Sequence, residues 1–170
     1  NFKVILGNEI YLCRDGLNGQ NFNKEEDKYF HFILLAKVAE GDKQIIEIST
    51  RAWMRSYMTG KMRRVPTYYQ DLIDIIGANP GHVIGSTACL GGFLGTKLIQ
   101  YKNMNSELKN YFYEKIKNWL KQMENIFGKE HFYLEMQPSN DKDQIFVNQQ
   151  IYYLSKELNI PYIITTDSHY

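Results

Sequence analysis

The second half of the chain alternates amphipathic helices with short apolar strands, and this order restricts the possible folds more than any other feature of the sequence. Between residues 106 and 127, apolar side chains recur every three or four positions, which predicts a long helix with one buried face. A strand, a helix and a strand are predicted after it, over residues 131–136, 141–158 and 160–165. Strands that alternate with helices indicate a parallel α/β sheet or barrel.

The ends of these helices allow further local predictions. Ser106 can cap the long helix and Gly128 can end it. Asp141, with Gln144 three residues later, resembles a capping box at the start of the next helix. The buried face predicted for the long helix consists of Leu108, Tyr111, Phe112, Ile116, Trp119, Leu120, Met123 and Phe127.

The first half of the chain opens with two strand-like segments, residues 3–13 and 29–36, separated by a polar, turn-rich loop. If they form a hairpin, Glu9 and His31 lie about equally far from the middle of the loop and are cross-strand neighbours that could share one ligand. A carboxylate in an apolar strand is unfavourable unless it is paired or bound to a cation. The alternative for His31 is a side chain that packs among aromatic residues with one nitrogen hydrogen-bonded.

Residues 40–54 predict a helix, and the one basic stretch of the chain follows it. The inner face expected for this helix consists of Ile45, Ile46, Ile48, Ala52 and Trp53. Between residues 51 and 70 there are basic side chains and no acidic one. Because arginine forks match phosphate oxygens, Arg63 and Arg64 are candidate phosphate ligands; a solvated loop is the alternative. A short helix is predicted over residues 68–76.

Two later segments offer candidate metal ligands. Residues 81–92 run from a strand into a turn of small residues and then a helix, an arrangement at which α/β proteins bind ligands. In this turn Cys89 could supply a thiolate to a metal, or be a buried, inert cysteine. Asp167 and His169 follow the last strand and, because side chains alternate along a strand, point to the same side. They suit a metal site or an acid–base pair; the alternative is a strand that leaves the core into a polar turn.

Length, charge and cysteine content narrow the class of protein. The 170 residues suit one domain, and 20 basic against 19 acidic side chains give no overall sign of a nucleic-acid or membrane-binding surface. No apolar run is long enough to span a bilayer, and no secretory signal opens the chain. Two widely separated cysteines favour a reducing cytoplasm. The chain starts without methionine and stops one residue after His169, so we expect an internal fragment of a longer protein.

Several segments, in this order and spacing, resemble the PHP (polymerase and histidinol phosphatase) domain: GNEIYL, YFHFILLAK, STRAW, STACLGG, FGKEHFYLEMQ and IPYIITTDSHY. More narrowly, they resemble this domain in the catalytic alpha subunit of bacterial-type DNA polymerase III, from a bacterium or a phage. By this resemblance, residues 1–170 form one partial PHP domain, truncated at both ends. The fold it implies is α/β, an incomplete, distorted (β/α)7 barrel similar to a TIM barrel, with its site at the carboxyl-terminal face of the strands.

The resemblance also implies a metal site. The family's ligand positions fall on Glu9, His31, Cys89, Asp167 and His169. They would hold a multinuclear cluster of zinc or manganese, and Asp167 and His169 would also take part in catalysis. In such a site, water activated by the metals attacks a phosphodiester while the cations neutralise charge on the phosphoryl oxygens. Arg63 or Arg64 would hold a phosphate.

Other parts of the family's machinery are expected outside this chain. These are a His-x-His motif on the first strand and the polymerase palm, which uses magnesium, so we expect the chain by itself to be inactive. The implied parent is a cytoplasmic DNA polymerase that contacts DNA and replisome subunits, such as a proofreading exonuclease, and no membrane. Three functions remain open: a metal-dependent 3′–5′ proofreading exonuclease, a structural, metal-stabilised module that docks a proofreading subunit, and a stand-alone phosphatase. The segments STRAW and ACLGG favour the polymerase over the last.

Overall fold

The computed structural model describes residue 2 and residues 4–166, so the predicted ligands Asp167 and His169 lie outside the described residues. The strands are β1 (Gly7–Cys13), β2 (Phe30–Ala36), β3 (Tyr57–Thr59), β4 (Met62–Arg64), β5 (Pro66–Tyr68), β6 (Val83–Ser86), β7 (Phe132–Met136) and β8 (Tyr162–Ile164). The helices are α1 (Ala39–Met54), α2 (Tyr69–Asp71), the π-helix η1 (Leu72–Gly77), α3 (Phe93–Lys102), α4 (Ser106–Phe127) and α5 (Lys142–Leu158).

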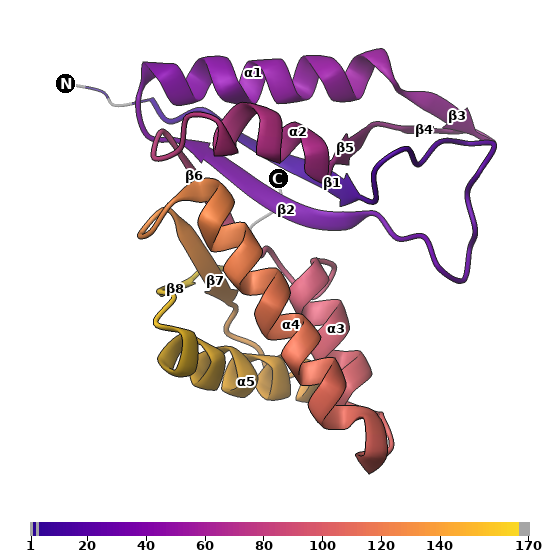
Figure 1. The fold of residues 1–170 in the computed structure, drawn as a ribbon, viewed down its shortest axis with the longest axis vertical. Helices are drawn as coiled ribbons and strands as arrows, with labels where there is room; N and C mark the ends of the chain where they lie inside the picture. Colours follow the sequence, from indigo (N-terminus) through magenta and orange to yellow (C-terminus); the bar gives the residue numbers. More distant parts are fainter. Residues whose placement is uncertain (1, 3, 167–170) are drawn as a thin grey trace.

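Six strands form one sheet in the order β5–β1–β2–β6–β7–β8 (Figure 1). The pairs β1–β5, β6–β7 and β7–β8 are parallel, whereas β2 is antiparallel to both β1 and β6. The predicted α/β fold and the hairpin of β1 and β2 are confirmed. The sheet is not wholly parallel, because β2 runs antiparallel to both of its neighbours. A loop without a crossover helix joins β1 to β2, as is usual for an antiparallel pair.

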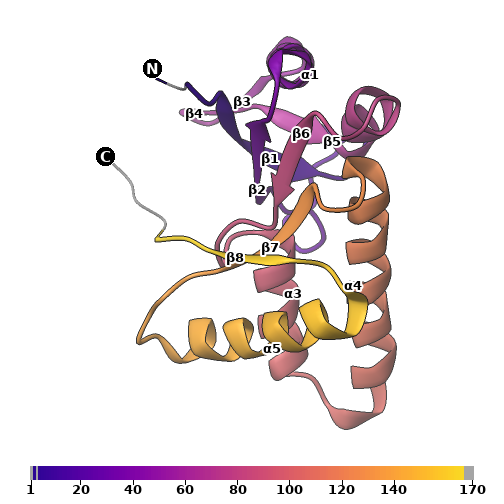
Figure 2. The ribbon, with the colours of Figure 1, turned by 90° about the vertical axis from the view of Figure 1, so that its left-hand side faces the viewer.

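In the described part of the chain the sheet is open. Its edges are β5 and β8, and no pairing joins them. The resemblance implied an incomplete, distorted barrel, and a TIM-like barrel is therefore not confirmed among these residues. Figure 2 shows the strands curving, with α1, α4 and α5 along the outside of the curve.

The core lies between the sheet and these helices. Helix α1 packs on β1, β2, β5 and β6, whereas α4 packs on β6 and β7 and α5 on β7 and β8. Large, fully buried side chains of the strands include Leu12, Phe32, Leu34 and Phe132. Full burial of each apolar side chain contributes about 1.5–3 kcal/mol, so this layer holds the helices on one face of the sheet.

Two predicted helix faces need correction. In α1, Ile45, Ile48 and Ala52 are buried as predicted, but Ile46 and Trp53 are more than half exposed, because the stripe that meets the sheet is narrower than the apolar pattern. In α4, burial begins at Ile116, whereas Leu108 and Tyr111 are about 60% exposed. The first turns of this long helix extend beyond the strands (Figure 1), so the sheet cannot cover them.

The helix ends agree with the predictions in part. Gly128 ends α4 with φ 89°, as predicted, but the N-cap of α4 is Asn105 rather than Ser106, and its side chain makes no capping hydrogen bond. Asp141 caps α5, accepting hydrogen bonds from the backbone N–H groups of Asp143 and Gln144. The reciprocal half of the predicted capping box is missing, because the Asp141 N–H donates to Ser139 Oγ, at 3.0 Å, rather than to the Gln144 side chain.

The segment between α1 and β6 differs from the prediction in detail. The stretch expected to be a loop contains a short hairpin, in which β3 pairs with β4. The helix predicted over residues 68–76 exists, but it changes from the α-helix α2 to the π-helix η1 at Leu72. Elements of three residues and a change of helix type leave no periodicity in a sequence, so the pattern could not indicate them.

Candidate metal centre

Glu9 and His31 point to the same face of the sheet. The register pairs Glu9 with Ile33, two residues beyond His31, so Glu9 and His31 are diagonal rather than direct cross-strand neighbours. The alternate side chains, among them Ile10 and Phe32, point into the core under the helices. The two polar side chains therefore lie on the face that the described helices leave open.

Three predicted ligands from separate segments meet at one nitrogen atom. Glu9 Oε1 lies 2.6 Å from Nδ1 of His31, and Cys89 Sγ lies 3.6 Å from the same atom. The side chains of Glu9 and His31 are 38% and 34% exposed, so solvent and a ligand can reach them. Counting from the loop predicted the contact of Glu9 with His31; the addition of Cys89 depends on the tertiary fold.

The turn of residues 87–92 holds Cys89 against the start of β2. The His31 N–H donates to the Gly91 carbonyl at 3.2 Å, and the Gly92 N–H donates to the Cys89 carbonyl at 2.9 Å. Ala88 adopts a left-handed conformation, with φ 56°, directly before the cysteine. Such a conformation costs an alanine about 1–2 kcal/mol and is typical of sites where the surrounding structure fixes the backbone for function.

The donor atoms suit a divalent metal. Carboxylate oxygen, imidazole nitrogen and thiolate sulfur are the ligands that zinc takes in proteins. Among the described residues, however, no group of three or more acidic, histidine or cysteine side chains has the spacing to hold a metal ion by itself. Glu9, His31 and Cys89 therefore supply part of a site, and the predicted donors Asp167 and His169 lie outside the described residues.

The second cysteine is not a candidate. Cys13 is fully buried in β1, and its thiol donates to the Thr67 carbonyl at 3.6 Å. Burial raises the pKa of this thiol to about 12, because a thiolate would lose its hydration there. Cys13 therefore stays protonated and serves packing, in contrast to the partly exposed Cys89.

The basic stretch is partly neutralised by acids from elsewhere in the chain. Arg55 forms a two-pronged ion pair with the buried Asp71, and its Nη2 lies 2.8 Å from Oδ1 of that residue. Arg51 pairs with Glu47 at 2.6 Å, one turn earlier in α1. The prediction counted charges along the chain and could not include Asp71, which reaches Arg55 only in the folded protein.

The two candidate phosphate ligands lie on β4. Arg63 donates from Nη1 to Ser56 Oγ at 3.0 Å, and Arg64 lies over the ring of Tyr29, 5.1 Å from its centroid. Within the described residues neither arginine forms an ion pair with a carboxylate. Tyr29 lies two residues before His31, so Arg64 approaches the end of the sheet at which the three ligands meet.

Comparisons with known proteins identify the family of the chain. The family model described as "PHP domain" matches residues 1–139. The chain belongs to the PHP family. The "Probable DNA polymerase YorL" of Bacillus subtilis is 35% identical to this PHP domain over 175 residues, as is a "DNA-directed DNA polymerase" of Bacillus phage SPbeta. A "DNA polymerase III subunit alpha" of Borreliella burgdorferi is 30% identical over 174 residues. Each alignment covers 99% of this chain but 13% of the relative.

The PHP domain also contains a buried carboxylate that the sequence analysis missed. Glu135, on β7, is 7% exposed and accepts hydrogen bonds from the side chains of Ser86, Gln137 and Thr165 at 2.5, 3.1 and 2.6 Å. An acidic residue within an apolar strand was the signal that drew attention to Glu9. The same signal was present at Glu135.

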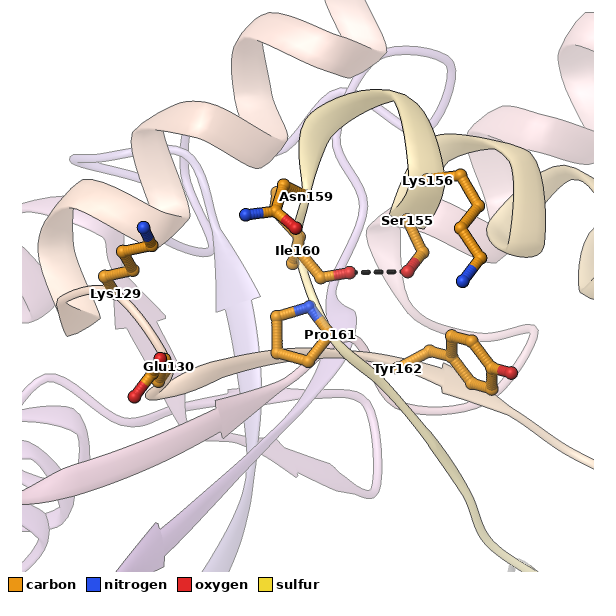
Figure 3. Close-up of a pocket in the computed structure, with 8 residues that line it drawn as sticks. All are labelled: Lys129, Glu130, Ser155, Lys156, Asn159, Ile160, Pro161 and Tyr162. Atoms are coloured by element: carbon orange, nitrogen blue, oxygen red, sulfur yellow. Dashed lines mark hydrogen bonds between the residues drawn. The ribbon is translucent and has the colours of Figure 1, made fainter.

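A cavity of about 430 Å³ lies elsewhere in the PHP domain (Figure 3). Its lining residues are Lys129, Glu130, Ser155, Lys156, Asn159, Ile160, Pro161 and Tyr162. Glu9, His31 and Cys89 are not among these lining residues. The cavity is therefore not the candidate site. In the described residues, no helix has both the length and the hydropathy needed to cross a membrane.

Proposed function

We propose that this PHP domain binds a cluster of divalent metals, zinc or manganese, and hydrolyses phosphodiesters as a 3′–5′ proofreading exonuclease within a DNA polymerase. The observation that carries the proposal is the contact of both Glu9 and Cys89 with the same nitrogen of His31. The names of the relatives, which are DNA polymerases, support DNA as the substrate and replication as the context.

The proposed ligands are Glu9, His31, Cys89, Asp167 and His169. Metal ions bound there would activate water and neutralise charge on the phosphoryl oxygens. Cys89 and Glu9 would bring negative charge to the cations, and the hydrogen bond that His31 makes through one nitrogen would fix the orientation of its ring. Asp167 and His169 would also hold or move a proton during cleavage.

The arginines of β4 would bind the substrate. The guanidinium of Arg63 is exposed, and that of Arg64 is half-buried against Tyr29. Because guanidinium groups bind phosphate oxygens in a planar, two-pronged geometry, either could hold a phosphate of the DNA strand next to the metals. A phosphate held there would place a neighbouring phosphodiester at the proposed cluster.

The wider context forms part of the same proposal. We infer a parent polymerase with a magnesium-dependent palm and replisome partners, among them a separate proofreading subunit. The curved sheet, open at β5 and β8, is compatible with extension into the barrel of the family. These inferences are supported by the relatives, of which this chain spans 13%.

A nuclease assay of the full-length protein on a primer with a mismatched 3′ end tests the activity. We expect Asp167→Asn to slow degradation by about 100-fold or more, as losing one electrostatic group from a transition state usually does. The matched control is Asp143→Asn, the same change at a surface residue that pairs with Lys102. The control should degrade the primer at the normal rate.

Unchanged degradation by Asp167→Asn would overturn the nuclease proposal. Binding of metal by the wild-type protein without degradation of any DNA end would instead leave the structural role, a metal-stabilised module in the polymerase. Removal of metal with a chelator, followed by return of zinc or manganese, separates these outcomes. In the proposed enzyme it abolishes and then restores the cleavage.

A further inference from the structure

Glu135 lies on the same face of the sheet as the candidate ligands. The register places Ile33 opposite Glu9 on one side and opposite Ser86 on the other, so these three residues form one row across β1, β2 and β6. On β7 the residue opposite Ser86 is Tyr133, and Glu135, two residues further on, points to the same face. Ser86 Oγ donates to Glu135 Oε2 at 2.5 Å. The buried carboxylate thus lies on the face that carries Glu9 and His31, and Ser86 is the polar residue between it and Glu9.

One side of Glu135 connects to the turn that carries Cys89. The Ser86 hydroxyl, which donates to Oε2 of Glu135, also accepts a hydrogen bond from the Ala88 N–H at 3.5 Å. In addition, the Glu135 N–H donates to Oγ1 of Thr87 at 2.9 Å. These bonds attach Glu135 to Ala88, through Ser86, and to Thr87. They therefore fix the backbone immediately before Cys89.

The other side of Glu135 connects to the segment after β8. Thr165 Oγ1 donates to Oε1 at 2.6 Å, and the Thr165 N–H donates to the Met136 carbonyl at 3.0 Å. Strand β8 is only three residues long and lies at the edge of the sheet. So short a strand makes few backbone hydrogen bonds. The hydrogen bond from Thr165 to the Glu135 carboxylate therefore adds a side-chain attachment there, two residues before Asp167.

Packing alone does not account for an acid at this position. A buried carboxylate loses its hydration, and an apolar side chain of similar volume would fill the site at lower cost. Here the loss is offset by three donated hydrogen bonds, and Gln137, one of the donors, is itself held by Asn148 of α5 at 2.8 Å. The described residues place no cationic side chain on the Glu135 carboxylate, so its partners are neutral groups that fix direction.

We propose that Glu135 is a positioning residue: its two oxygens join the turn that carries Cys89 to Thr165, directly after β8, and so hold Cys89 where it reaches the metal. This inference rests on the proposed metal site. Loss of a group hydrogen-bonded directly to a metal ligand typically costs about 10–100-fold in metal affinity. Because Glu135 acts through Ser86 and Thr165, we expect the lower end of this range. Glu135 itself touches neither metal nor substrate in this scheme.

The test is zinc affinity of the full-length protein, measured by competition with a chromophoric chelator. Thr165→Val removes the hydroxyl that donates to Glu135 and keeps the shape of the side chain, and it should weaken zinc binding by about 10-fold or more. Thr165→Ser keeps the hydroxyl and should bind zinc normally. Thr50→Val is the matched control, because it removes a hydroxyl that donates to Ile46 at 2.8 Å within α1.

A second variant tests the other arm. Ser86→Ala should alter the absorption band that the thiolate of Cys89 gives with cobalt, the spectroscopic substitute for zinc. Thermal unfolding of each variant without metal shows whether the fold is intact, since a purely structural role would lower the melting temperature without changing metal affinity.

The outcomes separate this inference from the proposed function. Zinc affinity equal to wild type in Thr165→Val, or an equal loss in Thr165→Ser, would overturn the role of Glu135. Cys89→Ser serves as the reference for the site itself. If it leaves zinc binding unchanged, the metal site fails and the positioning role fails with it; if it abolishes binding while Thr165→Val does not, only the positioning role is lost.

Discussion

The turn of residues 87–92 brings Cys89 to His31 through two backbone conditions. Ala88 takes a left-handed conformation, and Gly92 packs so closely that a Cβ atom there would lie 2.1 Å from the Thr87 carbonyl oxygen. Gly91 is different, because a Cβ there would meet the His31 ring and Cys89 Sγ at ordinary contact distances of 3.4–3.5 Å. The backbone of the turn therefore requires a glycine at position 92, whereas position 91 has room for a methyl group.

Substitution of these glycines distinguishes the two conditions. We expect Gly92→Ala to lower the free energy of unfolding by about 2 kcal/mol or more, because the backbone of the turn must move to admit a methyl group. Gly91→Ala, the matched control, should change it by about 0.5 kcal/mol or less. Urea denaturation measures both values, and equal destabilisation by the two variants would contradict this account of the turn.

At the scale of residues, the sequence predicted contacts that follow from local counting. Equal distance from a loop brought Glu9 to His31, and small residues around Cys89 indicated a turn near a ligand. It did not predict the ion pair of Arg55 with Asp71, because nothing in the sequence shows which arginine an acid sixteen positions later will meet. Glu135 carried the same signal as Glu9, an acid within an apolar strand, but its partners could not be predicted, since its donors come from three strands or their ends.

At the scale of elements, the two long helices begin in different ways. Asp141 accepts hydrogen bonds from the N–H groups of Asp143 and Gln144, at 2.9 and 3.0 Å, and so satisfies two otherwise unpaired donors of α5. Asn105 occupies the same position before α4 without a capping bond from its side chain. The stability of α5 should therefore depend on its cap, and that of α4 on its packing.

Alanine substitution at the two caps tests this difference. Asp141→Ala should destabilise the protein by about 1 kcal/mol and speed amide hydrogen exchange in the first turn of α5. Asn105→Ala should have almost no effect on α4. Hydrogen exchange followed by mass spectrometry resolves the two helices. A larger increase in exchange rate in α4 on Asn105→Ala than in α5 on Asp141→Ala would show that the capping geometry is wrong.

The periodicity of apolar residues could indicate only the long elements. Helices α4 and α5 and the strands around them follow the predicted order, because their apolar residues recur over many positions. The exposed start of α4 could not be predicted, since it depends on where the sheet ends rather than on the helix. The three-residue strands of the β3–β4 hairpin are too short to show alternation.

At the scale of the whole molecule, the fold separates two functions of the sheet. One face packs on helices and supplies stability, whereas the other carries Glu9, His31 and Glu135 on one side-chain row or beside it. The alternation of strands and helices predicted the layers. The alternation could not predict whether the sheet closes into a barrel. Closure depends on pairing between β5 and β8 or with further strands, and this pairing leaves no trace in the order of strands and helices.

The central claim is that Glu9, His31 and Cys89 bind a common metal cluster. Anomalous diffraction at the zinc absorption edge, from crystals of the full-length protein grown with zinc, locates the metal directly. The account predicts peaks within about 2.0–2.3 Å of a donor atom of each of these three side chains. A map in which zinc binds elsewhere, with no peak at bonding distance from them, would contradict it.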